Sequence, residues 1–271
     1  MTKRTSIFSQ VAELEMSGNA GALCMVISSK GSTPRRAGAK MIVYHDGSII
    51  GTVGGGELEN RVRHAALESI KDGRPVTLSY NMTDTKRGDP GICGGQVEVY
   101  VEPILPAPTI VVIGGGHVGK AVSHLAKWLG YRVAVSDDRP EFCSRKANPD
   151  ADLLLPIPMK DIPKKFAITP HTFIVLTTRG VDVDVEGLPV LIQSPASYIG
   201  VIGSRKRWSM TVSRLLAAGI SKNALKRIHS PIGININAET PEEIAVSILA
   251  EIIMIQNGGS GKPLKATTII K

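Results

Sequence analysis

The pattern of apolar positions changes between the two halves of the chain. In 96–102 (QVEVYVE) valines alternate with polar residues, whereas 109–113 (TIVVI) and 173–178 (FIVLTT) are almost continuous apolar runs. Alternation is typical of strands with one buried face, and continuous β-branched runs are typical of parallel strands buried on both faces. The pattern therefore predicts an α/β protein, with a mixed α/β N-terminal domain and a parallel-sheet domain after it.

Helices and strands alternate with turn signals along both halves. Helical spacing of apolar residues predicts helices over 6–17, 58–70, 210–218 and 242–256. Strands are expected at 22–28, 40–44, 48–53, 75–80 and 96–102, and then at 109–113, 153–157, 173–178 and 198–202. Prolines at 103, 106 and 108 cannot continue a helix or a central strand. We therefore place a linker there, with predicted domains at 1–104 and 105–271.

The stretch 109–138 carries a nucleotide-binding pattern. An apolar strand is followed by a glycine turn, a helix-period segment and a second apolar run. Gly114, Gly116 and Gly119 match the spacing G-x-G-x-x-G. The first glycine permits the tight turn, the second lets the backbone approach a pyrophosphate, and the third lets the helix pack closely on the strand. The C-terminal domain is therefore expected to be Rossmann-like.

Two side chains extend this pattern. Asp137 closes the second strand, where a carboxylate can accept hydrogen bonds from a ribose diol. His117 lies inside the glycine turn, where the helix N-terminus attracts anions, and is a candidate for contact with a phosphate. Whether the turn binds NAD or another nucleotide, or keeps its glycines for packing alone, stays open at this point.

Composition is that of a globular protein with a sizeable core. Apolar residues make up 42% of the 271 residues, and the mean hydropathy is +0.07. No apolar run is long enough to span a bilayer, and the N-terminal segment lacks the apolar region of a signal peptide, so we expect a cytoplasmic protein without a membrane partner. Cys24, Cys93 and Cys143 form no CxxC pair, which fits a reducing compartment and excludes an ordinary all-cysteine zinc site.

The chain is basic, with a net charge of +8 and a pI near 9.4. The positive residues stand in short groups rather than in one tract, and aromatic residues make up only 4% of the chain. Nucleic-acid binding favours a continuous basic surface with aromatic residues for base stacking. We therefore expect no nucleic-acid partner, and a small phosphorylated anion as the ligand.

Four turns, at 31–38, 54–57, 91–95 and 203–207, combine glycine with polar or charged residues. Each one alone is more often a plain connection between elements. Their recurrence beside arginines favours the alternative that several of them meet at one anion-binding crevice. The candidate binding residues in these turns are Arg35, Arg36, Gly54, Gly55, Gly56, Glu57, Cys93, Ser204 and Arg205.

The cysteines and one pair of aspartates leave alternatives open. Cys93 stands between glycines, where its sulfur is either exposed for chemistry or fills a gap in the core. Cys24 lies in an apolar strand and is expected in the core, whereas Cys143 is expected at the surface. Asp182 and Asp184 follow a strand end, where open α/β sheets place ligand groups, with a helix N-cap as the alternative. The usual motifs of hydrolases and kinases are absent, which disfavours those classes.

Longer segments carry a more specific signal than any single glycine motif. They are 31–43 (GSTPRRAGAKMIV), 51–62 (GTVGGGELENRV), 93–103 (CGGQVEVYVEP), 111–122 (VVIGGGHVGKAV), 135–142 (VSDDRPEF), 198–207 (YIGVIGSRKR) and 228–252 (IHSPIGININAETPEEIAVSILAEI). In this order they resemble the XdhC/CoxI family, the xanthine dehydrogenase accessory factors. The resemblance runs across nearly the whole chain and includes both predicted domains.

The resemblance implies a non-catalytic chaperone for the molybdenum cofactor. Family members bind molybdopterin, assist its sulfuration with a cysteine desulfurase, and pass it to an apo-molybdenum hydroxylase, and they are usually homodimers. By this resemblance Cys93 would contact molybdenum or its sulfur, and Arg35, Arg36 and the glycine turns would hold the phosphate. Many relatives read T-R-G-H-x-x-D where this chain has Val181 in place of the histidine, so only Asp184 is carried over as the matching acid.

Two other functions compete with this one. The first is an NAD(P)-dependent oxidoreductase, which the glycine pattern and Asp137 favour; Asp137 with Asp138 would prefer a 2′-hydroxyl and hence NAD. No hydride-transfer site can be named for it. The second is a regulatory or interaction protein that kept a Rossmann-like scaffold without a ligand, because a fold alone does not determine function.

Overall fold

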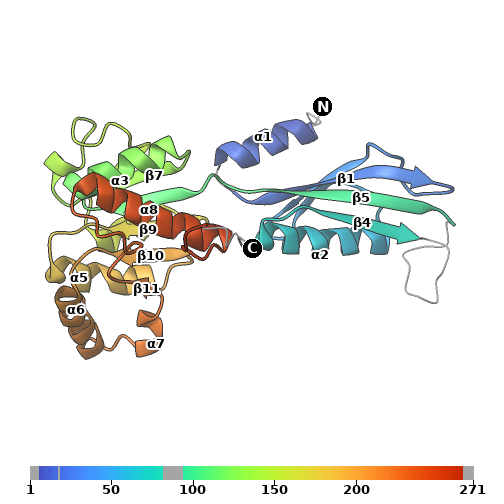
Figure 1. Ribbon diagram of the computed structural model, residues 1–271. Coiled ribbons are helices and arrows are strands. Elements are labelled where there is room, and N and C mark those ends of the chain that lie inside the picture. The colour runs from blue at the N-terminus through green and yellow to red at the C-terminus, as the bar shows by residue number, and fades with distance from the viewer. Residues whose placement is uncertain (1–5, 18, 82–93, 265–271) are drawn as a thin grey trace, which may run out of the picture. The chain divides into compact units, whose positions relative to one another are not determined.

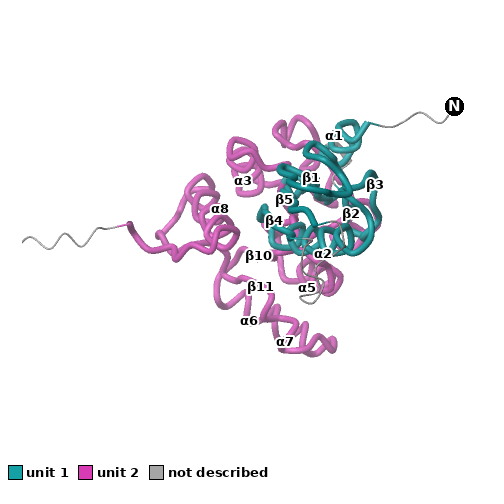
Figure 2. Tube along the Cα trace, turned by 90° about the vertical axis from the view of Figure 1, so that its right-hand side faces the viewer, with its two compact units in different colours: residues 1–107 teal, residues 108–271 magenta. Residues whose placement is uncertain are grey.

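The computed structural model describes residues 6–17, 19–81 and 94–264 (Figure 1). The chain folds into two compact units, Met1–Ala107 and Pro108–Lys271, which Figure 2 colours separately. Each unit has its own sheet and its own buried core. None of the helices in the described ranges is long and apolar enough to cross a membrane.

The first unit is a five-stranded antiparallel sheet in the order β3-β2-β1-β5-β4, with two helices. Its elements in chain order are α1 (Ile7–Ser17), β1 (Gly21–Lys30), β2 (Lys40–Tyr44), β3 (Ile49–Gly51), α2 (Gly56–Asp72), β4 (Val76–Asn81) and β5 (Gln96–Ile104). The mixed α/β fold expected for this part of the chain is therefore confirmed.

The helix α2 covers one face of this sheet. Val97, Val99 and Val101 of β5 are buried in one cluster with Leu58 and Val62 of α2, while the residues between the valines are partly or fully exposed. This is the one-sided burial that the alternating pattern predicts. The helix α1 packs in a second, smaller cluster on β2 and β5.

One proline behaves differently from the prediction. Pro103 lies inside β5, where it pairs with Ala22 of β1, so the expectation that it cannot continue a strand is wrong. The pairing of β5 with β4 ends at Val101, so β1 is the one described strand that flanks Pro103. A proline is tolerated there because a strand with a neighbour on one side has backbone groups outside the ladder.

The second unit is a six-stranded parallel sheet in the order β11-β10-β9-β6-β7-β8. Its strands are β6 (Thr109–Ile113), β7 (Arg132–Ser136), β8 (Leu153–Leu155), β9 (Thr172–Leu176), β10 (Tyr198–Val201) and β11 (Ile228–His229). Its helices are α3 (His117–Trp128), α4 (Ile162–Lys165), α5 (Val181–Ile192), α6 (Arg205–Ala217), α7 (Lys222–Leu225) and α8 (Pro241–Asn257).

Both faces of this sheet are buried, as the continuous apolar runs predict. Alternate residues of β6 belong to two different clusters: one contains α3 and α8, and the other contains α5 and α6. The chain moves outward from β6 through β7 to β8, and then returns to β9 on the other side of β6. The strand order therefore reverses between β6 and β9, which is where open α/β sheets place their ligands. The predicted Rossmann-like fold is confirmed.

Candidate functional site

The glycine turn between β6 and α3 is built by close packing at three positions. Gly114 has φ +109°, and a Cβ there would lie 2.5 Å from the carbonyl oxygen of Thr177. A Cβ on Gly115 would overlap the carbonyl oxygen of Phe142, and one on Gly119 would overlap that of Gly114. The fold itself therefore requires these glycines.

Gly116 differs from its neighbours in the turn. It has an ordinary φ of −71°, it is the N-cap of α3, and a Cβ there would meet no described atom within 4 Å. Neither backbone strain nor packing among the described residues explains a glycine at this position. A phosphate close to the backbone would explain it, because the N-terminus of α3, which begins at the exposed His117, presents N–H groups there.

The acid predicted to bind a ribose already accepts four hydrogen bonds. Asp137 Oδ1 accepts from the backbone N and from Nε of Arg139, and Oδ2 accepts from the backbone N of Gly115 and from Nη2 of Arg139, each at 3.0 Å. The Asp137 side chain is 2% exposed, and the guanidinium of Arg139 lies 3.9 Å from the ring centroid of Phe142. A ribose diol would bind Asp137 only by displacing Arg139 or the Gly115 amide.

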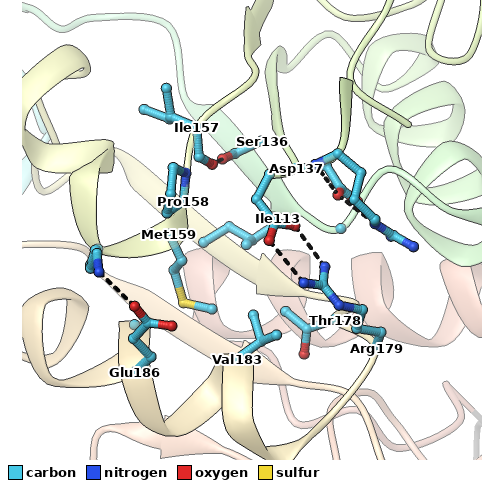
Figure 3. A pocket seen from close by; sticks show the side chains of 15 residues that line it. Ile113, Ser136, Asp137, Ile157, Pro158, Met159, Thr178, Arg179, Val183 and Glu186 are labelled. Atoms are coloured by element: carbon cyan, nitrogen blue, oxygen red, sulfur yellow. Dashed lines mark hydrogen bonds and ion pairs between the residues drawn. The ribbon is translucent and has the colours of Figure 1, made fainter. Parts of the chain in front are cut away.

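A cavity of about 80 Å³ lies at the carboxyl edge of the parallel sheet, where β6, β7 and β9 end (Figure 3). Its wall is apolar and includes Ile113, Ile157, Met159 and Val183. Ligand pockets for drug-sized molecules usually measure about 300–1,000 Å³. The closed cavity therefore has room for a small group and not for a whole nucleotide or pterin.

Two ion pairs on the rim of this cavity join segments that are distant in the sequence. The guanidinium of Arg179, after β9, binds both carboxylate oxygens of Asp138, after β7, at 2.6 and 2.8 Å. Because β6 lies between β7 and β9, this pair spans the end of β6. Its hydrogen bonds lower the pKa of Asp138 to about 2. On the other side, Lys160 Nζ lies 2.6 Å from Glu186 Oε1.

The loop after β9 also holds a buried charge. Gly180 is the N-cap of α5, so the N-cap interpretation of Asp182 and Asp184 is wrong, and both lie in the first turn of the helix. Asp184 is completely buried and accepts hydrogen bonds from the Thr178 hydroxyl and, at 2.6 Å, from Arg207 Nη2. This acid therefore joins α5 to α6 and is not presented to a ligand.

The turn before α6 is a helix cap. The Ser204 hydroxyl accepts a hydrogen bond of 3.2 Å from the backbone N of Arg207, so α6 begins at Arg205 and not at residue 210 as predicted. Arg205 is exposed and makes no ion pair with the residues that the structure describes. Anion binding by Ser204 and Arg205 stays a prediction.

Three of the four predicted turns gather in the first unit. A Cβ on Gly95 would overlap the carbonyl oxygen of Ser32, so the described end of the third turn lies against the first. A Cβ on Gly54 would lie 3.3 Å from Cβ of Pro34, so the second turn also lies against the first. The fourth turn belongs to the second unit, so the gathering described here involves the first three.

The arginines of the first turn face solvent. Arg35 and Arg36 are both exposed, and within 6–17, 19–81 and 94–264 neither has an ion-pair partner. Both cations are therefore accessible to an anion beside the gathered turns. Cys93 lies outside the described residues, directly before Gly94.

A glutamate that was not predicted organises the second turn. Glu59 Oε2 accepts hydrogen bonds from the Thr52 hydroxyl and, at 3.3 Å, from the backbone N of Gly55. The predicted acid, Glu57, instead forms an ion pair of 3.0 Å with Arg61 one helical turn later. Glu59 thus holds the turn in place, and Glu57 lies exposed beside it.

Comparison with known proteins accounts for both units. The family model of the XdhC Rossmann domain matches residues 110–252, and that of the XdhC and CoxI family matches residues 14–81. The chain belongs to the XdhC and CoxI family. The resemblance seen in the sequence is thereby confirmed.

Individual relatives of this XdhC-family chain are bacterial. It is 34% identical to "Uncharacterized protein YqeB" of Escherichia coli (strain K12) over 94% of this chain and 47% of that protein. It is 34% identical to a probable xanthine dehydrogenase subunit of Bacillus subtilis (strain 168) over 57% and 45%. It is 21% identical to "Molybdenum cofactor insertion chaperone PaoD" of Escherichia coli over 90% and 86%. The chain spans about half the length of the first two relatives.

The two cysteines that the structure describes in this XdhC-family chain are both buried. Burial raises the pKa of Cys24 to about 12, as expected for a core thiol. The surface location predicted for Cys143 is wrong: its thiol donates a hydrogen bond of 3.3 Å to the carbonyl oxygen of Val135, and burial raises its pKa. The described residues contain no group of three or more His, Cys, Asp or Glu that could hold a metal ion.

The sequence did contain a signal for the residues that were missed. Arg179 and Asp138 each follow a buried strand of the parallel sheet, and those strands flank the strand that opens the glycine pattern. Since the carboxyl ends of parallel strands share one edge, this placement could have singled out the pair. Attention to Asp182 and Asp184 in the same loop led away from it.

Proposed function

We propose that this XdhC-family protein binds the molybdopterin cofactor as cargo and delivers it to a xanthine dehydrogenase-type molybdenum hydroxylase. The observation that supports the proposal best is the family match in both units. One relative is named as a molybdenum cofactor insertion chaperone and another as a probable xanthine dehydrogenase subunit. In this proposal the protein is a non-catalytic cytoplasmic homodimer, and a cysteine desulfurase supplies the sulfur for the cofactor.

The gathered turns of the first unit supply the proposed cargo contacts. Arg35 and Arg36 are exposed cations without an ion-pair partner among the described residues, and a phosphate is the anion that arginine binds best. Cys93 directly precedes Gly94, which belongs to the same group of turns. A thiolate is a soft ligand suited to molybdenum or its sulfur, so Cys93 is the proposed contact to the metal end.

A second candidate function, NAD-dependent oxidation or reduction, has one observation in its favour. The reversal of strand order at β6 and β9, with an open approach at Gly116, is the arrangement that dinucleotide-binding domains use. Against it, Asp137 is already bound by Arg139 and the Gly115 amide. A nicotinamide titration therefore belongs beside the cargo assay.

The test is anaerobic purification of the protein from a molybdenum-replete host, with assay of bound molybdenum and oxidised pterin. Near-stoichiometric pterin is expected, with strong loss in Cys93→Ala and in the double variant Arg35→Ala/Arg36→Ala. The matched control is Lys71→Ala, which removes an exposed cation in the last turn of α2. The 17 residues of α2 place it about 25 Å from the glycine turn at the helix start.

Two outcomes would contradict the proposal. One is a protein free of pterin and molybdenum under these conditions that nevertheless binds NAD saturably, which would favour the oxidoreductase. The other is retention of cargo by both site variants at the level of the Lys71→Ala control, which would remove the first unit from the proposed cargo site.

A further inference from the structure

Every charged side chain on the rim of the crevice cavity is paired with another rim residue. The rim pairs are Asp137 with Arg139, Asp138 with Arg179, and Lys160 with Glu186. The rim therefore carries as many negative as positive side chains. An anionic ligand can gain a cation here only by taking it from one of these acids.

The pairs differ in how readily they can exchange partners. The Asp137 side chain is 2% exposed and also holds the Gly115 amide, so releasing Arg139 would leave a buried carboxylate without its cation. The side chains of Asp138 and Arg179 are 38% and 45% exposed, so water can solvate either one after separation. Exposed pairs of this kind are weak, because water screens the attraction.

Arg179 has the better position and chemistry of the two exchangeable cations. It follows β9, the strand next to β6, and it lines the same cavity as Gly114 of the glycine turn. Figure 3 shows its guanidinium turned to the carboxylate that it binds in bidentate fashion. The same planar fork matches two oxygens of a phosphate, whereas the ammonium of Lys160 is a point charge.

We propose that Arg179 is the phosphate-binding residue of this crevice, and that Asp138 occupies its guanidinium until a ligand arrives. The ligand class is a phosphate ester or diphosphate, whose oxygens replace the carboxylate of Asp138. The cavity of about 80 Å³ accommodates a phosphate group but not a ring system. Separation of the pair, which spans the end of β6, also opens the crevice for the rest of the ligand.

This inference goes beyond the accessory-factor function and does not depend on it, because it concerns any phosphorylated ligand. It also makes a prediction opposite in sign to the dinucleotide alternative. If an acid after β7 bound a ribose, its removal would weaken ligand binding. If Asp138 competes with the ligand for Arg179, its removal strengthens binding.

The test is calorimetric titration of the full chain with inorganic pyrophosphate, inorganic phosphate and NAD, in the wild type and in Asp138→Asn and Arg179→Gln. The matched control is Asp182→Asn, which breaks another exposed ion pair, with Arg214, outside the cavity lining. The tightest probe distinguishes a monophosphate ligand from a diphosphate or a dinucleotide. A urea unfolding curve of each variant checks that it is folded.

For the tightest probe, Asp138→Asn should lower the dissociation constant about three- to tenfold, because an exposed competing ion pair is removed. Arg179→Gln should raise it about tenfold or more, as expected for a lost charged hydrogen bond. The Asp182→Asn control should leave it unchanged. Weaker or unchanged binding in Asp138→Asn, or absence of binding of all three probes to every variant, would overturn the proposal.

Discussion

Two arginines of α6 offer a matched test of how burial sets the strength of an ion pair in this fold. Arg207 binds Asp184 at 2.6 Å and Arg214 binds Asp182 at 2.5 Å, and both aspartates lie in the first turn of α5. The side chains of Arg207 and Asp184 are 21% and 0% exposed, whereas those of Arg214 and Asp182 are 51% and 88% exposed. We expect Arg207→Ala to be far more destabilising than Arg214→Ala.

The magnitudes follow from what each change leaves behind. Without Arg207, the buried carboxylate of Asp184 keeps the Thr178 hydroxyl as its side-chain partner among the described residues. Arg207 also donates to the carbonyl oxygen of Thr178 at 3.1 Å, so a second acceptor loses a donor. Breaking one side of a buried pair costs about 3–5 kcal/mol. An exposed pair such as Arg214 with Asp182 contributes at most about 1 kcal/mol.

The assay is urea unfolding followed by tryptophan fluorescence. The two tryptophans of the sequence, Trp128 on α3 and Trp208 on α6, both lie in the second unit, so the signal reports on the unit that carries the mutations. Adding Asp184→Asn to Arg207→Ala should restore part of the lost free energy of unfolding, because no unpaired charge then remains buried. A loss for Arg207→Ala no larger than that for Arg214→Ala would refute the reasoning.

Three further predictions concern other parts of the structure. Gly119→Ala should strongly lower the urea midpoint because its Cβ would overlap a carbonyl oxygen of the turn, whereas Gly116→Ala should change the midpoint little and weaken pyrophosphate binding; equal midpoint shifts would contradict this. Cys24, whose pKa burial raises to about 12, should resist Ellman's reagent at about pH 8 until urea unfolds the protein, and rapid native labelling would count against its burial. Arg179 lowers the pKa of Asp138 from 3.8 to about 2, so the stability from this pair should be complete above pH 3.8 and be lost as the pH falls through about 2. Asp138→Asn should therefore slightly flatten the acid limb of stability against pH, and an unaltered limb would show that the pair contributes nothing.

Local sterics and periodicity explain what the sequence could predict. The alternation of Val97, Val99 and Val101 depends only on the two-residue period of a strand, and all three valines are buried on one face. Gly114 and Gly119 are required by contacts within one βαβ unit, so a local pattern was enough to find them. The parallel sheet followed from the same kind of local information.

Pairing between distant segments explains what was missed. Asp138 and Arg179 stand 41 residues apart in the sequence, and they meet because β7 and β9 flank β6 and end at the same edge. Nothing local marks either residue as the partner of the other. Cys143 was misplaced for a related reason: polar neighbours suggest a surface residue, but its thiol turns back to the carbonyl oxygen of Val135 in β7.

The glycines of the two units differ in what they say about a ligand. In the first unit Gly55 and Gly56 have φ +75° and +58°, so the backbone conformation alone explains them, and Gly95 is explained by its contact with the first turn. In the second unit Gly119 is explained by packing, but Gly116 has neither a positive φ nor a neighbour that a Cβ would meet. A motif match alone treats all these glycines as equal evidence for binding. The structure concentrates that evidence at one position in the crevice, next to the cavity where an arginine is held by an exchangeable acid.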